Sequence, residues 1–195
     1  MYDPKRIHKV CAHIARHFTE KVKPNGYKGQ VVVYDRECCL KYKEELDKLL
    51  GTKASTIVMD TNDDKQDKYK LYRRSKDEEA KVLDRFRDPH DPLQLVIVTS
   101  KLLTGFDAPI LQVMYLHKPM KDHTLLQAIC RTNRTYDEGK TSGLIVDYIG
   151  IFDNVAKALN FDEAGMKKIV TNIEEVKKKV PALLKKCLSY SMGVD

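Results

Sequence analysis

Short apolar runs alternate with amphipathic stretches along most of this chain. The apolar runs are rich in β-branched residues, which predicts strands that are covered on both faces. They lie at residues 30–34, 54–59, 95–98, 110–116 and 143–148. Apolar residues at helical spacing predict helices at 3–22, 37–50, 78–87 and 122–133. This alternation predicts an α/β fold in three layers, with helices on both faces of a mainly parallel sheet.

Capping and breaking residues set the helix boundaries. Asp3 and Pro4 open the first helix, and the sequence Pro-Asn-Gly at 24–26 ends it. Gly51 follows the second helix, and Asp122 is placed to cap the fourth. Three of the four predicted helices therefore have a local reason to start or stop.

Residues 60–76 carry almost no apolar anchors. Cations alternate there with Tyr69 and Tyr72; they are Lys65, Lys68, Lys70, Arg73, Arg74 and Lys76. Cations beside aromatic rings suit contact with nucleic acid, through phosphate neutralisation and base stacking. A solvated, mobile insertion is the alternative, and the composition favours it.

An apolar stripe at helical spacing follows residue 160 and predicts a helical extension at 161–195, after a first domain at 1–160. The stripe comprises Met166, Ile169, Val170, Ile173, Val176 and Val180. Pro181 should kink or split this helix. The stripe packs either on the first domain, which we favour, or on a helical domain outside this sequence.

Candidate ligand-binding residues follow the predicted strand at 95–98. Thr99 and Ser100 carry hydroxyl groups that can donate to phosphate oxygens. Gly105 permits a tight turn or a close approach to a ligand. We expect Asp107 at the carboxyl end of a strand unit, where ligands bind in open α/β sheets.

Gln127, Arg131 and Arg134 share one face of the predicted helix at 122–133. Two guanidinium groups beside an amide suit a polyphosphate, because planar forks bind anionic oxygens and stabilise charge on a transferred phosphoryl group. A solvated helix face is the alternative that spacing alone leaves open.

Two phrases in this stretch resemble motifs of superfamily 2 helicases. TSKLLTGFD at 99–107 resembles motif V, and QAICRTNR at 127–134 resembles motif VI, whose pattern is Q-x-x-G-R-x-x-R, with Cys130 in place of glycine. The phrases LLTGFDAPILQ, DHTLLQAICRTNR and GLIVDYIGIF resemble the motor (R) subunit of type I restriction enzymes. The resemblance covers about residues 3–159. It implies the second RecA-like lobe of a two-lobe motor that couples ATP hydrolysis to translocation of duplex DNA.

The resemblance implies roles for two sets of residues. In the nucleotide set, Asp107 accepts from the ribose beside Gly105 and Gln127, while Arg131 and Arg134 reach the β- and γ-phosphates. Arg134 is the arginine finger. The DNA-backbone set is Thr99, Ser100, Lys101 and Arg36, where an exposed loop arginine is the equal alternative for Arg36. One strand end is expected to carry both sets and to convert lobe closure into a step along DNA.

No G-x-x-x-x-G-K-[ST] phosphate loop occurs in the sequence, and no strand-borne Asp-Glu pair suited to magnesium follows such a loop. The resemblance therefore implies that ATP with Mg²⁺ binds only together with a missing first lobe. The nuclease residues of the family belong to another domain. We expect this chain to be a piece of a larger protein that hydrolyses nothing alone.

The partners implied are double-stranded DNA, the modification and specificity subunits of the restriction complex, and the first lobe and nuclease domain of the same protein. Two other functions stay open. One is a lobe of another superfamily 2 DNA translocase. The other is a non-catalytic α/β interaction module, in which the arginine face binds an acidic partner.

Composition adds limits to this prediction. The 195 residues carry 35 Lys and Arg against 28 Asp and Glu, and this net charge of +7 is compatible with a polyanionic partner. No apolar run is long enough to span a bilayer and no signal peptide is recognisable, so we expect a cytoplasmic protein without membrane contact.

The five cysteines include no C-x-x-C pair and are expected to be reduced thiols. For the vicinal Cys38 and Cys39, packing at a helix start is favoured over redox activity. His8, His13 and His17 have helical spacing that could mimic a metal site. We expect no metal, because neither a carboxylate nor a thiolate is arranged to complete the shell.

Overall fold

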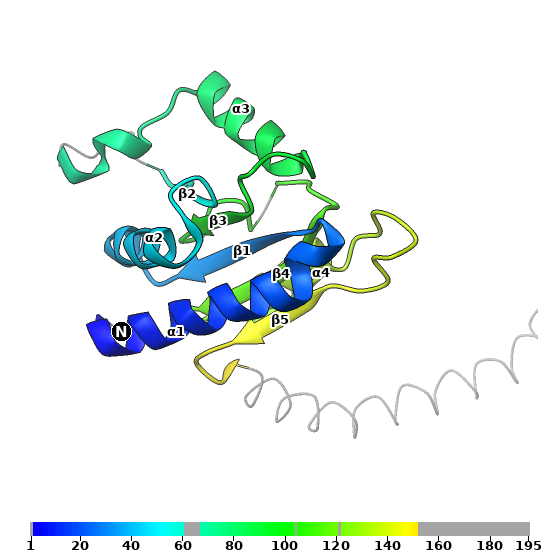
Figure 1. Ribbon diagram of the computed structural model, residues 1–195, viewed down its shortest axis with the longest axis horizontal. Coiled ribbons are helices and arrows are strands. Elements are labelled where there is room, and N and C mark those ends of the chain that lie inside the picture. Colours follow the sequence, from blue (N-terminus) through cyan, green and yellow to red (C-terminus); the bar gives the residue numbers. More distant parts are fainter. Residues whose placement is uncertain (1, 61–66, 104, 121, 152–195) are drawn as a thin grey trace, which may run out of the picture. The chain divides into compact units, whose positions relative to one another are not determined.

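A computed structural model describes residues 2–60, 67–103, 105–120 and 122–151 of the protein (Figure 1). Residues up to Ile151 belong to one compact unit. The predicted boundary at residue 160 and the predicted helical segment 161–195 lie outside the described residues and stay predictions.

Five parallel strands form the sheet in the order β2-β3-β1-β4-β5. The strands are β1 (Lys28–Val33), β2 (Ser55–Ile57), β3 (Leu95–Val98), β4 (Leu111–His117) and β5 (Leu144–Asp147). Every residue of β1 and β3 is buried. The apolar run Leu95–Val98 accounts for this in β3, whereas β1 combines the apolar residues 31–33 with the buried polar residues Lys28 and Gln30. The predicted α/β fold with a parallel sheet is confirmed.

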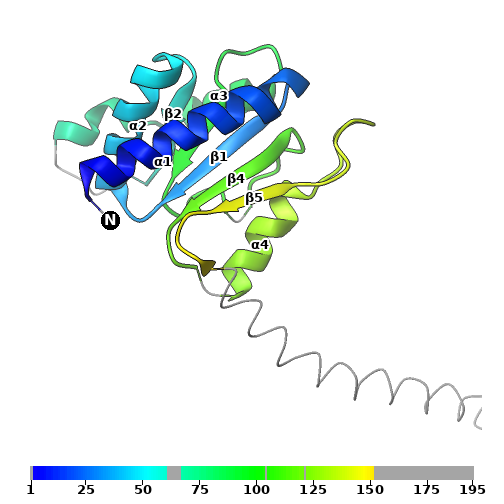
Figure 2. The same ribbon diagram turned by 60° about the horizontal axis from the view of Figure 1, so that its bottom comes forward.

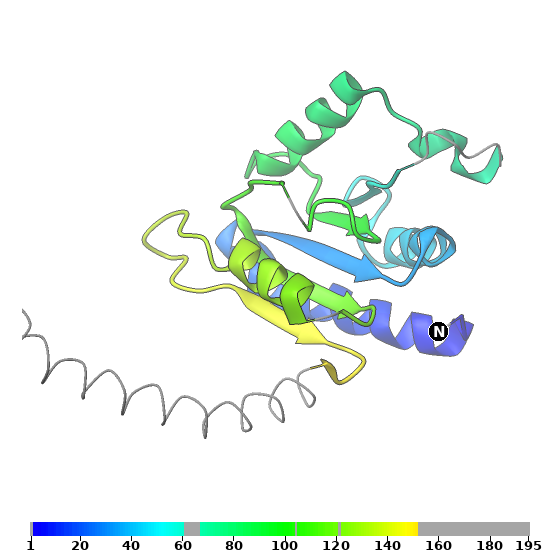
Figure 3. The ribbon, with the colours of Figure 1, turned by 180° about the vertical axis from the view of Figure 1, so that it is seen from behind.

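Helices cover both faces of the sheet (Figure 2 and Figure 3). Helix α1 (Pro4–His17) packs beside α2 (Arg36–Leu50) on one face, and α4 (Asp122–Thr132) lies on the other. The predicted three layers are therefore present. None of the helices in the described part of the chain is long and apolar enough to cross a membrane.

The histidines of α1 hold this helix to neighbouring elements. His13 Nδ1 lies 2.6 Å from the Tyr148 hydroxyl, and His17 Nδ1 lies 2.9 Å from the Tyr115 hydroxyl of β4. His8 Nδ1 instead lies 2.9 Å from a Glu45 carboxylate oxygen of α2. Each of the three imidazoles therefore has its own partner, and together they attach α1 to its neighbours. Among the described residues, no cluster of His, Cys, Asp and Glu side chains could hold a metal ion.

Helix α2 starts and stops where the sequence predicts. The Asp35 carboxylate accepts from the Cys38 amide at 2.9 Å, and Gly51 follows the last turn with φ of 88°. Cys38 and Cys39 are buried in the first turns. Burial raises the pKa of the Cys39 thiol to about 12, which keeps it protonated and supports the packing interpretation.

Helix α3 (Lys76–Arg87) begins earlier than predicted, because Ser75 and Glu78 form a capping box. The Ser75 amide donates to the Glu78 carboxylate at 2.7 Å, and the Glu78 amide donates back to the Ser75 hydroxyl at 3.2 Å. Phe86 is fully buried, whereas Val82 and Leu83 are only half-buried.

The described part of the polar segment, residues 67–76, is mostly exposed, as expected of a solvated segment, but two of its side chains are anchored to the rest of the lobe. A 3-10 helix at Asp67–Tyr72 buries Tyr69. Arg74 donates to the Ile57 carbonyl at 2.6 Å and to the Thr56 hydroxyl at 2.9 Å. Sequence pattern missed these anchors, because they are one aromatic ring and one guanidinium in a stretch without apolar periodicity.

Candidate functional site

A loop at Thr99–Ile110 connects β3 to β4 and carries much of the predicted site. Its described residues form no helix. It leaves the carboxyl end of β3 and returns to the amino end of β4, where the Lys28 amide donates to the Ile110 carbonyl at 3.1 Å. Asp107 therefore lies near the amino end of β4, and its expected place at a carboxyl strand end is wrong. The physical reason is that the chain has already crossed back over the sheet when it reaches Asp107.

The nucleotide set meets where this loop passes the end of α4. An Arg134 Nη1 lies 2.6 Å from Asp107 Oδ1, and both side chains are largely open to solvent, at 43% and 59% exposed. Arg131 Nη1 donates to the Phe106 carbonyl at 2.7 Å. Arg131 and Arg134 thus contact adjacent residues of the loop. The predicted single helix face is wrong for Arg134, because α4 ends at Thr132.

Backbone conformation and a third arginine fix the loop at this point. Gly105 has φ of 71°, a conformation that glycine adopts without strain. Arg87, at the end of α3, donates from Nε to the Asp107 carbonyl at 2.9 Å and lies 5.2 Å from the centre of the Phe106 ring. Sequence analysis missed Arg87, because nothing in the pattern distinguishes it from other arginines at helix ends.

Gln127 lies on α4, half-buried, one turn before Arg131. This position puts it on the same helix face as Arg131, as the spacing predicts, whereas Arg134 lies beyond the helix. Its role toward a nucleotide stays a prediction.

The DNA-backbone set lies at the other edge of the sheet, around the carboxyl ends of β1 and β3. Lys118, directly after β4, donates from Nζ to the Thr99 carbonyl at 3.1 Å, and Ser100 is exposed. Lys101 is bound by two carboxylates, at 2.9 Å from Asp60 and 2.7 Å from Glu79. Sequence analysis did not include Lys118 among the candidates for DNA contact, although its place directly after a strand indicates the same edge of the sheet.

Arg36 begins α2 at the carboxyl end of β1. Its guanidinium lies 5.2 Å from the centre of the Tyr69 ring and donates to the Asp60 carbonyl at 3.4 Å. These contacts hold the side chain at the same edge as Thr99, so it differs from an unrestrained loop arginine.

The two sets are thus not on one strand end, contrary to the sequence-based expectation. The DNA set follows strands at their carboxyl ends, whereas Asp107 precedes a strand at its amino end. The connecting loop Thr99–Ile110 belongs to both, so it is the element through which one set can influence the other.

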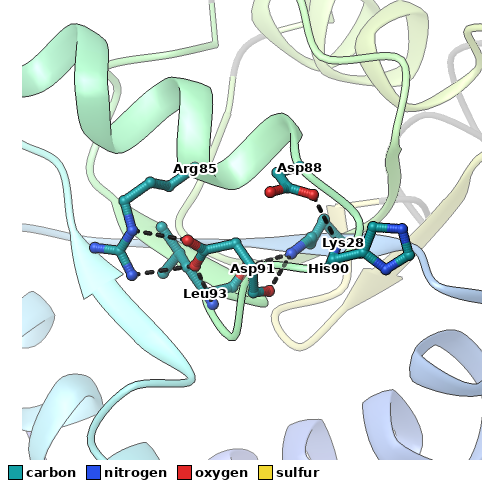
Figure 4. A network of polar contacts seen from close by, with 6 residues as sticks. All are labelled: Lys28, Arg85, Asp88, His90, Asp91 and Leu93. Atoms are coloured by element: carbon teal, nitrogen blue, oxygen red, sulfur yellow. Dashed lines mark hydrogen bonds and ion pairs between the residues drawn. The ribbon is translucent and has the colours of Figure 1, made fainter.

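Two buried lysines line the amino edge of the sheet. Lys28 donates from Nζ to the carbonyls of Asp91 at 2.8 Å and Leu93 at 2.6 Å (Figure 4). The Asp91 carboxylate in turn accepts from Arg85 Nε at 2.9 Å. Lys140 donates to carbonyls of the α4–β5 connection and of the start of β4. No hydrophobic pattern predicts a buried lysine, and sequence analysis missed both.

The all-parallel sheet with helices on both faces is the RecA-like fold that solved helicase lobes share. The C-terminal domain of the DEAD-box protein Dbp5 superposes with a TM-score of 0.53 at 13% identity, over 77% of this chain and 78% of that one. A fragment of a putative HsdR subunit from Vibrio vulnificus YJ016 gives a TM-score of 0.51 at 20% identity, over 76% of this chain and 29% of that chain.

Residues 9–150 match the family model for type I restriction enzyme subunit R domain 3, and the chain belongs to this family. A putative type I restriction enzyme MjaIXP endonuclease subunit from Methanocaldococcus jannaschii is 34% identical over 97% of this chain. The HindI endonuclease subunit from Haemophilus influenzae is 36% identical over 75% of this chain. The chain spans less than a fifth of these relatives, at 18% and 15% of their lengths. The predicted family is thereby confirmed.

Proposed function

We propose that this lobe completes an ATP site formed with the first RecA-like lobe of a longer type I restriction subunit. The observation that carries the proposal is the convergence of Arg134, Arg131, Asp107 and Gly105 on one solvent-accessible place. The first lobe would supply the phosphate loop and the carboxylates that hold Mg²⁺. The lobe described here then hydrolyses no ATP by itself.

The chemistry of the Arg134–Asp107 pair suits a nucleotide that takes the place of the ion pair. Asp107 can accept from a ribose hydroxyl, and the Arg134 guanidinium can donate to γ-phosphate oxygens as negative charge shifts on them. Without nucleotide the two side chains neutralise each other at 2.6 Å. Binding exchanges one ion pair for two contacts with ATP, which keeps both groups hydrogen-bonded throughout.

The comparisons support the wider assignment of a DNA-dependent motor. Curated relatives are named as endonuclease subunits of type I restriction enzymes. The helicase MrfA, with a TM-score of 0.52, was solved with bound DNA and AMPPNP. We propose double-stranded DNA, the modification and specificity subunits, and the nuclease domain of the same protein as partners.

DNA is proposed to lie along the carboxyl edge of the sheet, where Thr99, Ser100, Lys118 and Arg36 contact phosphates without reading bases. Lys101 is a weaker candidate than the sequence suggests, because Asp60 and Glu79 already balance its charge. Loop Thr99–Ile110 would transmit DNA engagement to Asp107 on the nucleotide side.

Replacing Lys118 by alanine tests this DNA edge. In the full-length protein assembled with its partner subunits, we expect the apparent affinity for double-stranded DNA to fall about tenfold, because one charged phosphate contact is lost. ATP hydrolysis at saturating DNA should change little. DNA-stimulated ATP hydrolysis, titrated with DNA at several salt concentrations, measures both quantities, and the salt slope should decrease by about 1.

Lys9→Ala is the matched control, since Lys9 is an exposed lysine of α1. It removes the same charge from a helix that carries none of the proposed DNA-contact residues. Equal DNA affinity in the Lys118→Ala and Lys9→Ala proteins would rule out the proposed contact. ATP hydrolysis that does not respond to DNA in the unmodified assembly would overturn the motor assignment.

A further inference from the structure

Lys140 is one of the least exposed residues of the described chain, at 2% exposed. Its ammonium donates to the Arg134 carbonyl at 2.7 Å, to the Leu111 carbonyl at 2.8 Å and to the Pro109 carbonyl. All three N–H groups of the ammonium can therefore have backbone acceptors.

These acceptors belong to the segments that build the proposed nucleotide site. Pro109 closely follows Asp107 in the crossing loop, Leu111 begins β4, and Arg134 carries the proposed finger. The Lys140 ammonium thus joins the main chain of Arg134 to the main chain that follows Asp107.

Arg134 needs such support, because it lies beyond the last residue of α4, Thr132. The helical hydrogen-bond ladder reaches only to the Asn133 amide, which donates to the Ile129 carbonyl at 3.0 Å. The Arg134 main chain is outside this ladder. An arginine that stabilises a transition state must be held to a fraction of an ångström by its surroundings.

The loop that carries Lys140 is itself ordered by Asp137. The Asp137 carboxylate accepts from the Lys140 amide at 2.8 Å, from the Gly139 amide at 3.0 Å and from the Tyr27 hydroxyl at 2.6 Å. The position of the Lys140 ammonium is therefore fixed by the Asp137 contacts of its own loop as well as by its three carbonyl acceptors.

Burying the Lys140 ammonium costs desolvation free energy, and a residue that only stabilised the fold would not need a charge here. Burial lowers the pKa of the Lys140 ammonium to about 8, against the opposing effect of Asp137, which shows that its surroundings disfavour the cation. An apolar side chain with the carbonyls turned to solvent would avoid this desolvation. What the lysine provides is a fixed geometry of three backbone segments.

We propose that Lys140 is a positioning residue for ATP hydrolysis, whose ammonium fixes the main chain of Arg134 and Pro109 so that the Arg134 guanidinium and the Asp107 carboxylate face the nucleotide together. This inference rests on the proposed function of the Arg134–Asp107 site. It assigns a function to a residue that neither motif V nor motif VI contains.

Lys28 offers a matched control for the test. It is also buried at the amino edge of the sheet, at 1% exposed, and burial also lowers the pKa of its ammonium. Its acceptors are the carbonyls of Asp91 and Leu93, which do not belong to the proposed site (Figure 4). Lys28→Met and Lys140→Met therefore remove equivalent buried cations from two places.

The experiment compares both variants in the full-length protein assembled with its partner subunits. We expect the thermal stabilities of Lys140→Met and Lys28→Met to fall by similar amounts. At a temperature where both are folded, kcat for DNA-dependent ATP hydrolysis should fall about thirtyfold in Lys140→Met, since misplacement by about 1 Å costs up to about a hundredfold. KM for ATP should change less than threefold, and kcat of Lys28→Met should stay within twofold of the unmodified protein.

Asp137→Ala provides a second variant if Lys140→Met does not fold. Asp137 is exposed, so the fold should survive its loss, while the loop that places Lys140 loosens. We expect kcat of Asp137→Ala to fall about fivefold. Asp67→Ala removes another exposed aspartate and serves as the control, and its kcat should be unchanged.

The outcomes separate this inference from the function on which it rests. Equal kcat values in Lys140→Met and Lys28→Met, or an unchanged kcat in Asp137→Ala, would reject the positioning role if Arg134→Ala is strongly impaired. An unimpaired Arg134→Ala would instead reject the nucleotide site itself.

Discussion

Replacing Arg134 by alanine in the full-length protein, assembled with its partner subunits, is expected to lower kcat for DNA-dependent ATP hydrolysis about a thousandfold. The guanidinium is expected to contact the γ-phosphate most strongly in the transition state, so its loss should affect kcat much more than KM. Steady-state ATP hydrolysis at saturating DNA measures the effect. Arg134→Lys should recover little activity, because an ammonium lacks the planar fork that binds two oxygens at once.

Arg16→Ala serves as the control for this prediction, because Arg16 is an exposed arginine of α1 on the other face of the sheet. Its kcat should equal that of the unmodified protein. A kcat of the Arg134→Ala protein within threefold of the Arg16→Ala value would contradict the finger role.

Gly143→Ala is expected to destabilise the lobe by about 3 kcal/mol or more. Gly143 directly precedes β5, and a Cβ atom there would lie 2.4 Å from the carbonyl carbon of Thr132 and 2.5 Å from its oxygen. These are main-chain atoms at the end of α4, so relief requires α4 and β5 to move apart. The Asn133 side chain, which accepts from the Gly143 amide at 3.1 Å, would be displaced as well.

Thermal unfolding followed by circular dichroism checks this prediction, and Tm should fall by roughly 6–12 °C for a chain of this size. Gly139→Ala is the comparison, because a Cβ atom there would meet the Tyr27 hydroxyl at 2.9 Å, which is the far end of a side chain. We expect it to lower Tm by less than about 3 °C. Equal Tm values for the two variants would show that the close approach of β5 to α4 has been misjudged.

Local signals predicted the framework of the lobe well. The run Leu95–Val98 is a strand over the predicted residues, because both faces of a central strand are apolar and its ends are polar. The end of α2 was predicted from Gly51, whereas its N-cap Asp35 was not identified from the sequence. The boundary of α3 was missed because the Ser75–Glu78 capping box was not recognised in a stretch dominated by lysines.

The functional residues were predictable only as far as local spacing and motif resemblance reach. Helical spacing predicted Arg131 and Arg134 on one face, but α4 ends at Thr132, and the contact of Arg134 with Asp107 depends on how the loop crosses the sheet. Lys28 and Lys140 were beyond prediction for a similar reason. Their acceptors are backbone carbonyls of distant segments, and a carbonyl carries no sequence signal.

Because the DNA-backbone set and the nucleotide set are separated, coupling between them requires a connecting element. The proposed DNA contacts at the carboxyl edge and the proposed nucleotide contacts near the amino end of β4 are joined by loop Thr99–Ile110. Arg87 and Arg131 both donate to carbonyls of this loop, at 2.9 Å and 2.7 Å. A shift of the loop on DNA binding would therefore reach Asp107 directly.

We propose that Arg134 and Asp107 separate from each other to bind ATP opposite a first lobe. A structure of the full-length protein with DNA, ADP and aluminium fluoride tests it most directly, because the fluoride mimics the γ-phosphoryl group in transfer. We predict Arg134 within about 3 Å of the fluoride and Asp107 at hydrogen-bonding distance from a ribose hydroxyl. A nucleotide bound with the Arg134–Asp107 ion pair still intact at 2.6 Å would contradict the account.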